Sequence, residues 1–440
     1  MSTPSPLKPA PPFDLEQLFD KIRRLDVHTP QGMAGLLAKE STFVFNYGEV
    51  EPDAAVSLTM PVRRKSYSSG ALMNVFAMNR PEGYLRYIIE ERLARFGTPS
   101  DMFLLFLAGR NQIGRLTYAL HGQTVPEGEG ERLDELLSSP SGQLFERLVS
   151  KYALGSGISG VQPKTVVPLA SEVPASAALS DVATPGVDTP GIATLDAHAT
   201  LPLTTVIVKA EGDDYAGIAR NEFLCMSVAR EAGFDVPDFW LSNDGLLFVM
   251  ARFDRAPDGT PLGFEDMSVL TGNDKYRGSY EMIGRAVEVY TGDDFRAQSL
   301  RLFERVALSC FLRDGDAHMK NIGIIYTDPT GPRRLSPIYD VVCTGIYPLL
   351  DGRMALNLNK SKVFPVPGQL IAYGERLGLK RAEAEAILLR IDQAFDTVAE
   401  RLGQDDRYKA DDLLTRIRDV IRRTGAIPVA RAKRPAFRLP

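Results

Sequence analysis

A polar stretch between two apolar segments, residues 312–321, most constrains how this chain can fold. It places two acids, an imidazole, an ammonium and an amide within ten residues, after a helical apolar run and before a strand-like one. Such a stretch is typical of a functional loop held between two buried elements. In phosphoryl-transfer loops a carboxylate accepts the proton of the attacking hydroxyl and an amide further along binds Mg²⁺, as Asp316 and Asn321 could do. Asp340, which follows the apolar run 335–339, is a candidate second metal ligand. A solvated turn with incidental charges is the simpler explanation of this stretch alone, because short motifs recur by chance.

The composition is that of a globular protein with more than one core. The 440 residues are 44% hydrophobic and 24% charged, which suffices for two or more lobes. A formal net charge of -5 gives no global nucleic-acid signature. The three cysteines have no metal-ligand spacing and indicate buried thiols in a reducing compartment. We identify neither a secretory signal nor an apolar run of membrane-spanning length, and we expect a cytoplasmic protein.

The first third of the chain predicts a mixed α/β subdomain over residues 14–150, after a Pro/Ser-rich disordered tail at 1–13. Extended pieces between residues 26 and 47 predict a small antiparallel sheet. Further strands are expected at 55–62 and 115–120. Helical patterns occur at 15–25, 70–78, 81–96, 101–108 and 133–152.

A glycine- and serine-rich loop at residues 155–164 is the second informative stretch. Its backbone N–H groups suit an approach to phosphates, although a flexible surface turn has the same composition. The Ala/Ser/Thr/Pro/Gly tract at 170–200 cannot bury a core, so we expect a mobile insertion. A strand over 204–209 then ends on Lys209, and Glu222 lies on a predicted helix. This pair matches the ion pair that positions phosphates, but also a surface lysine and a solvated glutamate.

A predicted hairpin follows, with its turn at Asp244-Gly245 and its strands at 239–241 and 246–250. Residues 251–255 make a natural connector between lobes. We assign 151–255 to an N-terminal kinase lobe, 256–425 to a helical C-terminal lobe and 426–440 to a basic tail. The helices expected in the C-terminal lobe span 280–290, 299–312, 369–376, 381–402 and 411–423.

The order of these parts is that of a two-lobed protein kinase, although H-R-D and D-F-G motifs are not found. We therefore predict an α+β fold with a mixed α/β N-terminal lobe and an all-α C-terminal lobe. The chain resembles, over most of its length, the HipA family of serine/threonine kinase toxins from bacterial HipBA toxin-antitoxin modules. The matching segments are I-S-G-V-Q-P-K (158–164), V-K (208–209), N-E (221–222), R-F-D-R (252–255), E-D-M (265–267), D-A-H-M-K-N (316–321) and I-Y-D (338–340), with further similarity at 43–47 and 58–96.

The resemblance implies a serine/threonine protein kinase that uses ATP and Mg²⁺. It makes Asp316 the catalytic base, Asn321 and Asp340 the metal ligands, and Lys209 the residue that orients the phosphates, with Glu222 as its ionic partner. The backbone of 251–253 would be the adenine-binding hinge. The other ATP-binding residues that it implies are Ser159, Gly160, Val161, Gln162, Pro163, Lys164, Ala251, Arg252, Phe253, His318, Met319, Lys320 and Tyr339.

The resemblance also implies regulation and partners. Family members autophosphorylate a serine in the glycine-rich loop, which removes the loop from its ATP-competent position, and added charge beside bound nucleotide is a physical reason for the inactivation. Ser159 is the first candidate and Ser156 the second, while Gly157 stands where some members have a further serine. Ala251 stands where some members carry an acid. The expected partners are a protein substrate and a HipB-like helix-turn-helix antitoxin, with weak or indirect DNA contact and no membrane.

Two other functions are compatible with the sequence. A kinase-like corepressor would bind an antitoxin and help it hold operator DNA, with the basic C-terminal segment touching phosphates. A solvated tail is the simpler explanation of that segment. A small-molecule kinase of the aminoglycoside or choline type would share the Asp/Asn/Asp arrangement. The basic residues in question are Arg416, Arg418, Arg422, Arg423, Arg431, Lys433, Arg434 and Arg438.

Overall fold

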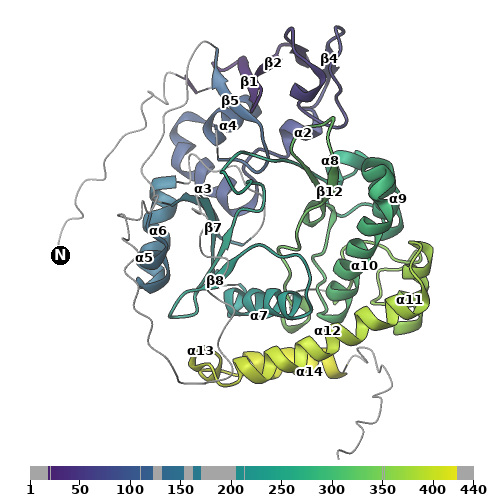
Figure 1. Ribbon diagram of the computed structural model, residues 1–440. Helices are drawn as coiled ribbons and strands as arrows, with labels where there is room; N and C mark the ends of the chain where they lie inside the picture. Colours follow the sequence, from purple (N-terminus) through teal and green to yellow (C-terminus); the bar gives the residue numbers. More distant parts are fainter. Residues whose placement is uncertain are drawn as a thin grey trace, which may run out of the picture.

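The computed structural model describes residues 18–19, 21–109, 111–121, 131–152, 162–169, 205–212, 214–348, 350 and 352–423. The tails expected at 1–13 and 426–440, the 170–200 insertion and most of the glycine-rich loop lie outside these ranges. Within them the chain forms three antiparallel sheets surrounded by helices, with the N-terminal sheet at one end of the molecule and the C-terminal helices at the other (Figure 1). No helix of this described part is long and apolar enough to cross a membrane.

The N-terminal subdomain is built on a five-stranded sheet in the order β4-β3-β2-β1-β5. Alternate residues of β1 and β3, such as Leu25 and Phe45, point into a core closed by α4 and α3. The antiparallel sheet predicted between residues 26 and 47 is therefore confirmed. Its strands are β1 Arg24–Thr29, β2 Gly32–Lys39, β3 Phe43–Tyr47, β4 Tyr67–Ser69 and β5 Thr117–Leu120.

Two expectations in this subdomain are wrong. The helix predicted to reach residue 25 ends before β1, because Leu25 pairs with Leu37 and Leu120 in the sheet. The strand predicted at 55–62 is a turn closed by an isolated bridge between Ser57 and Met60. The helical run 133–152 is broken at Pro140 into two helices, as expected for a residue without an N–H. The helices here are α2 Asn74–Ala77, α3 Gly83–Leu93, α4 Asp101–Ala108, α5 Leu133–Ser138 and α6 Ser141–Tyr152, with single turns η1 Pro52–Ala54 and η2 Ala94–Phe96.

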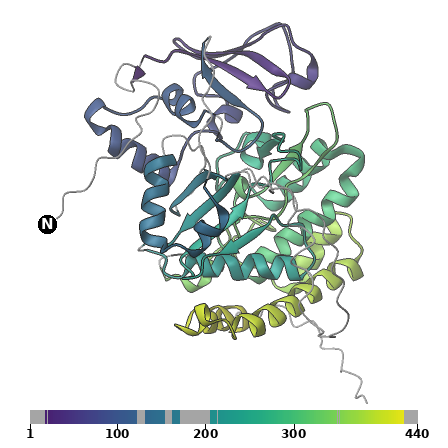
Figure 2. The same cartoon turned by 60° about the vertical axis from the view of Figure 1, so that its left-hand side comes forward.

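The second sheet has four antiparallel strands in the order β6-β7-β9-β8. It consists of β6 Lys164–Pro168, β7 Thr205–Ala210, β8 Phe239–Leu241 and β9 Leu247–Ala251, so the predicted hairpin and lysine strand are confirmed. Val206, Ile207 and Val208 of β7 are buried, which suits a central strand. Helix α7, Ile218–Glu231, packs against this sheet and against α12, and runs beside α12 in both views of the fold (Figure 2).

The C-terminal lobe is helical but also contains a three-stranded sheet, so the expectation of an all-α lobe is wrong in this detail. The sheet has the order β10-β11-β12, with β10 Gly263–Asp266, β11 Gly323–Tyr326 and β12 Arg333–Leu335. The helices are α8 Met267–Thr271, α9 Tyr280–Thr291, α10 Phe295–Phe311, α11 Pro367–Arg376, α12 Arg381–Leu402, α13 Asp406–Lys409 and α14 Leu413–Arg423, with single turns η4 Gly292–Asp294, η5 Met319–Asn321 and η6 Thr344–Ile346.

The N-terminal subdomain is joined to both lobes by buried polar contacts. Asp254, in the connector after β9, accepts a hydrogen bond from the Gly114 backbone N–H at 2.6 Å. Glu265 of β10 accepts from the Ser57 hydroxyl at 2.6 Å and from the Leu58 N–H at 2.7 Å. Lys320, in the polar loop, forms a partly buried ion pair with Glu82 at 2.7 Å. The connector, β10 and the polar loop are therefore all joined to the N-terminal subdomain.

We expect Asp254→Asn to lower the free energy of unfolding at pH 7. Burial raises the pKa of this carboxyl, but Arg252 and Arg255 outweigh burial and hold it at about 2. A depressed pKa stabilises the fold above the unfolded value near 3.8 and loses this contribution as the pH falls toward 2. The shift corresponds to about 2 kcal/mol. Denaturant titrations at pH 7 and near pH 2 measure it, with Asp258→Asn in an exposed turn as control. Equal stability of the two variants at pH 7 would contradict the expectation.

Candidate active site

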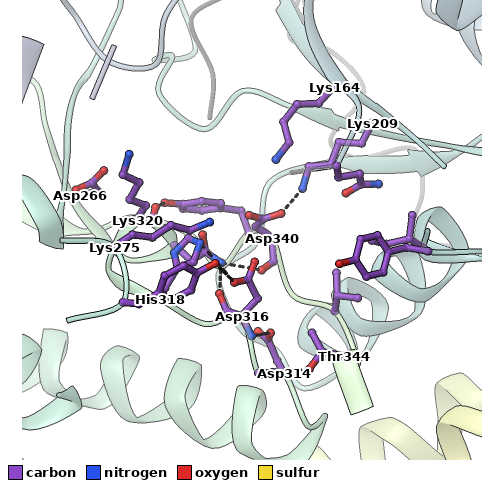
Figure 3. A pocket seen from close by; sticks show the side chains of 18 of the residues that line it. Lys164, Lys209, Asp266, Lys275, Asp314, Asp316, His318, Lys320, Asp340 and Thr344 are labelled. Carbon is purple, nitrogen blue, oxygen red and sulfur yellow. Dashed lines mark hydrogen bonds and ion pairs between the residues drawn. The ribbon is translucent and has the colours of Figure 1, made fainter. Parts of the chain in front are cut away.

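A cleft of about 350 Å³ lies between the four-stranded sheet and the helical lobe. This volume is within the range of small-ligand sites. Figure 3 shows its charged side chains, with Lys164 and Lys209 on one side of Asp340 and with Asp316, His318 and Lys275 gathered on the other. The polar loop 312–321, the glycine-rich end at Gln162 and the segment around Asp340 thus meet at one cavity, although they are far apart in sequence.

Lys209 stands at the centre of a buried ion triad. Its ammonium donates to Glu222 at 2.5 Å and to Asp340 at 2.6 Å. Lys209 and Glu222 are both buried, and Asp340 is about a quarter exposed to the cleft. Helix α7 carries Glu222 under the sheet, where Asn221 also fixes the Cys343 backbone through two hydrogen bonds of 3.0 and 2.9 Å. The ion pair expected between Lys209 and Glu222 is therefore present in the structure, extended by Asp340.

The polar loop is held by its own side chains. Asp314, which is buried, accepts from the Asp316 N–H at 3.0 Å. The Asn321 amide nitrogen donates to the Asp316 carbonyl at 2.9 Å. Gly315 allows a close approach of the chain, because a Cβ at this position would lie 2.5 Å from the Arg353 carbonyl oxygen. These contacts fix the backbone of the loop and leave the Asp316 carboxylate about half exposed in the cleft.

Burial and neighbouring charges shift the pKa values of two cleft acids, Asp316 and Asp340, in opposite directions. Burial raises the pKa of Asp316, with Lys275 acting against the rise. Burial would also raise the pKa of Asp340, but the ammonium groups of Lys209 and Lys164 outweigh it and hold the pKa well below its usual range. Burial and Lys275 lower the pKa of His318, so its imidazole is neutral. One carboxyl is thus suited to accept a proton, and the other to remain an anion.

The residues proposed as metal ligands have oxygen atoms suited to Mg²⁺. Asp340 is ionised. The Asn321 amide nitrogen donates to the Asp316 carbonyl, which leaves the Asn321 amide oxygen as the atom for a cation. The φ angle of Asp340 is 57°, a left-handed conformation rare for an L-residue other than asparagine or aspartate. Within the described residues no group of three or more His, Cys, Asp or Glu side chains could hold a metal. Mg²⁺ in proteins usually keeps several water ligands and binds one or two carboxylates together with phosphate oxygens.

The aromatic end of the cleft differs from the expected hinge. Phe253 stacks on Tyr339 with 4.6 Å between ring centroids, and both rings line the cleft. The Ala251 N–H donates to the Asp238 carbonyl and the Arg252 N–H to the Thr205 carbonyl. The Arg252 side chain turns away to Asp254. Of the three hinge residues expected to meet adenine, only Phe253 therefore lines the cleft.

The other predicted site residues divide into three groups. Those that line the cleft are Gln162, Lys164, Lys209, Phe253, Asp316, His318, Lys320, Asn321, Tyr339 and Asp340. Those that the structure places outside its lining are Pro163, Glu222, Ala251, Arg252 and Met319. Ser156, Ser159, Gly160 and Val161 lie outside the described residues.

Several residues that line the cleft were not predicted from the sequence. Met78 and Ile113 come from the N-terminal subdomain, for which the sequence predicted no site residue. Asp266 lines the cleft and caps α8 by accepting from the Ser268 N–H at 2.8 Å. Lys275 and Tyr276 come from the segment between α8 and α9. In the sequence Lys275 and Tyr276 are an adjacent Lys-Tyr pair in a polar stretch, and such a pair also occurs by chance.

Fold and cleft together define a two-lobed, kinase-like protein, and the comparisons with known proteins agree. The HipA-like C-terminal domain matches residues 156–399, and the HipA N-terminal domain matches residues 25–119. The first of these matches spans more than half of the chain. The chain belongs to the HipA family.

Individual relatives support the assignment. A Sinorhizobium fredii protein described as a candidate kinase, Y4dM, is 28% identical over 350 residues, which cover 73% of this chain and 76% of that protein. A Haemophilus influenzae protein described as a candidate kinase is 31% identical over 194 residues, 39% of this chain and 56% of its own length. The solved HipA from Shewanella oneidensis, in a complex with HipB and operator DNA, superposes with a TM-score of 0.61 at 19% identity, covering 91% of this chain and 96% of that one. The last similarity shows the fold.

Proposed function

We propose that this protein is an ATP- and Mg²⁺-dependent serine/threonine protein kinase and the toxin of a toxin-antitoxin pair. The observation that supports it best is the Lys209 triad facing Asp316 across one cleft, since an orienting lysine, a metal-binding acid and a base are the parts of phosphoryl transfer. The two relatives described as candidate kinases support the same reaction.

Each side chain has a role in this proposal. Lys209 and Lys164 bind the phosphates, and Glu222 fixes the Lys209 ammonium from below the sheet. The carboxylate of Asp316 accepts the proton of the attacking hydroxyl, while the backbone contacts of Asp314 and Asn321 keep it in place. Asn321 and Asp340 would hold Mg²⁺, which neutralises charge on the transferred group. Phe253 and Tyr339 offer an aromatic wall for the base of the nucleotide.

Partner and regulation are part of the same proposal. HipA from Shewanella oneidensis was solved with HipB and operator DNA, and we infer an equivalent helix-turn-helix antitoxin here. Autophosphorylation at Ser159 or Ser156 would add charge beside the phosphates and inactivate the enzyme. In the basic C-terminal segment Arg422 is engaged by Asp392 at 2.5 Å and Arg416 by the Ile346 carbonyl at 2.9 Å. Because these two side chains already have partners within the protein, they are less available to contact DNA phosphates.

Transfer of labelled phosphate from ATP tests the reaction. Purified protein with Mg²⁺ is expected to label itself on serine and to label protein in a bacterial lysate, and EDTA is expected to stop both. Mass spectrometry then assigns the modified serine. Normal ATP binding without any transfer would contradict the kinase proposal. Transfer to an aminoglycoside or choline in preference to protein would favour a small-molecule kinase.

A further inference from the structure

We propose that Tyr276 positions the Asp316 carboxylate. This inference rests on the proposed function, in which Asp316 is the catalytic base. The Tyr276 hydroxyl donates a hydrogen bond to Oδ1 of Asp316 at 3.0 Å. Tyr276 belongs to the segment between α8 and α9 and is about half exposed, as is the Asp316 side chain. A base oriented by a third group is a recurring arrangement in catalytic sites.

No other hydrogen bond to this carboxylate occurs within the described residues. The Nε2 atom of His318 lies 3.8 Å from Oδ1, which is too long for a hydrogen bond. Asp314 and Asn321 bind the backbone N–H and C=O of Asp316 and leave its side chain free to rotate. Tyr276 therefore sets the direction of the carboxylate and leaves Oδ2 for the acceptor hydroxyl.

The tyrosine is itself held against the loop that it orients. Its ring meets the His318 ring edge-on, with 5.3 Å between the centroids. The carbonyl of its neighbour Lys275 accepts a hydrogen bond from the Met319 N–H at 3.1 Å. The segment and the polar loop are thus joined both through backbone and through rings. This two-point attachment gives the phenol a defined position despite its exposure.

The hydrogen bond also changes the chemistry of the base. A phenol that donates to a carboxylate stabilises the ionised form, so Tyr276 acts against the rise that burial causes in the pKa of Asp316. The charged and titratable groups that face Asp316 are Lys275 and Tyr276 from the segment before α9, Asp314 and His318 from its own loop, Lys164 from β6, and Asp340.

Tyr276→Phe tests the proposal because it keeps the ring contact with His318 and removes only the hydroxyl. We expect kcat to fall about tenfold, part of the roughly 10²–10⁴-fold that a positioned base contributes, with KM for ATP unchanged. Tyr87→Phe is the matched control, because the Tyr87 hydroxyl donates to Glu91 on the exposed side of α3 and neither residue lines the cleft. An unchanged or increased kcat, or a change confined to KM for ATP, would overturn the proposal.

A second measurement separates this inference from the kinase proposal. Crystal structures of wild type and of Tyr276→Phe, determined without nucleotide, show the direction of the Asp316 carboxylate. We expect the carboxylate to turn away from its wild-type direction in Tyr276→Phe. If it turns but wild type transfers no phosphate, the contact stands and the kinase proposal fails. If wild type transfers phosphate but the carboxylate keeps its direction in Tyr276→Phe, the role of Tyr276 fails alone.

Discussion

Asp316→Asn is expected to remove phosphoryl transfer and to leave ATP binding intact. The amide cannot take up the proton of an attacking hydroxyl, and a positioned base contributes roughly 10²–10⁴-fold to the rate. Since Asp316 is about half exposed and fixed through its backbone, asparagine fits the loop without strain. The measurement is phosphate transfer from labelled ATP beside ATP affinity from calorimetry.

The proposed role of Asp316 also predicts how the phosphate-transfer rate of the wild type depends on pH. Burial raises the pKa of Asp316, and only the ionised carboxylate accepts a proton, so the rate falls as the pH drops through the raised value. Asp406→Asn, which changes a fully exposed side chain, controls for the general effect of replacing an aspartate by an asparagine. If Asp316→Asn arrested growth and supported operator binding as wild type does, a corepressor function would be favoured over catalysis.

Lys209→Met is expected to cost both activity and stability. The ammonium neutralises Glu222, which is buried beneath the sheet, and removing it leaves that carboxylate without its ion partner. Breaking a buried ion pair from one side destabilises by roughly 3–5 kcal/mol. Transfer is expected to fall about 10²-fold or more, because a preorganised cation facing the phosphates is lost. Urea unfolding and labelled-ATP transfer measure the two effects.

The double variant Lys209→Met, Glu222→Gln distinguishes the two contributions. Burial raises the pKa of Glu222 and favours its neutral form, which glutamine imitates, so stability is expected to recover in part. Activity is not expected to recover, because no cation faces the phosphates. Lys65→Met, at an exposed lysine of the N-terminal subdomain, is the control. Full recovery of transfer in the double variant would show that Lys209 acts only through stability.

Local patterns predicted the parts of the fold that are stabilised locally. The apolar stripe of residues 381–402 predicted α12 with its observed bounds, and the Asp-Gly turn predicted the pairing of β8 with β9. The β-branched run before Lys209 predicted a buried strand, which is β7. In each case the residues that determine the structure are neighbours in sequence, so propensity and periodicity are sufficient.

The errors arose where distant residues determine the structure. The segment 55–62 alternates like a strand, but Glu265 takes the Leu58 N–H and the Ser57 hydroxyl and so closes it as a turn. Strand β10 has only four residues, all buried, and its partner β11 follows almost sixty residues later. So short a run has no periodicity of its own. It forms a strand because it pairs with β11, and the residues next to β10 in the sequence do not indicate that pairing.

The same distinction applies to the site. Lys209, Glu222 and Asp340 were grouped because their order along the chain is that of a kinase, and the structure brings them within hydrogen-bonding distance. Tyr276 could not be predicted in this way. Its contact with Asp316 joins residues 40 positions apart, and it depends on where a turn before α9 lies. The hinge role of residues 251–253 stays a prediction: the N–H groups of Ala251 and Arg252 donate inside the lobe, and Phe253 lines the cleft.

The attachment of the N-terminal sheet has a consequence for how the protein can be dissected. A chain shortened to the part that matches the HipA-like C-terminal domain would lose the Gly114 and Leu58 donors while keeping the buried acids Asp254 and Glu265. Unsatisfied buried carboxylates are costly, and the wall that Met78 and Ile113 form would be missing. The unit that can be purified with a complete cleft therefore includes both matched domains.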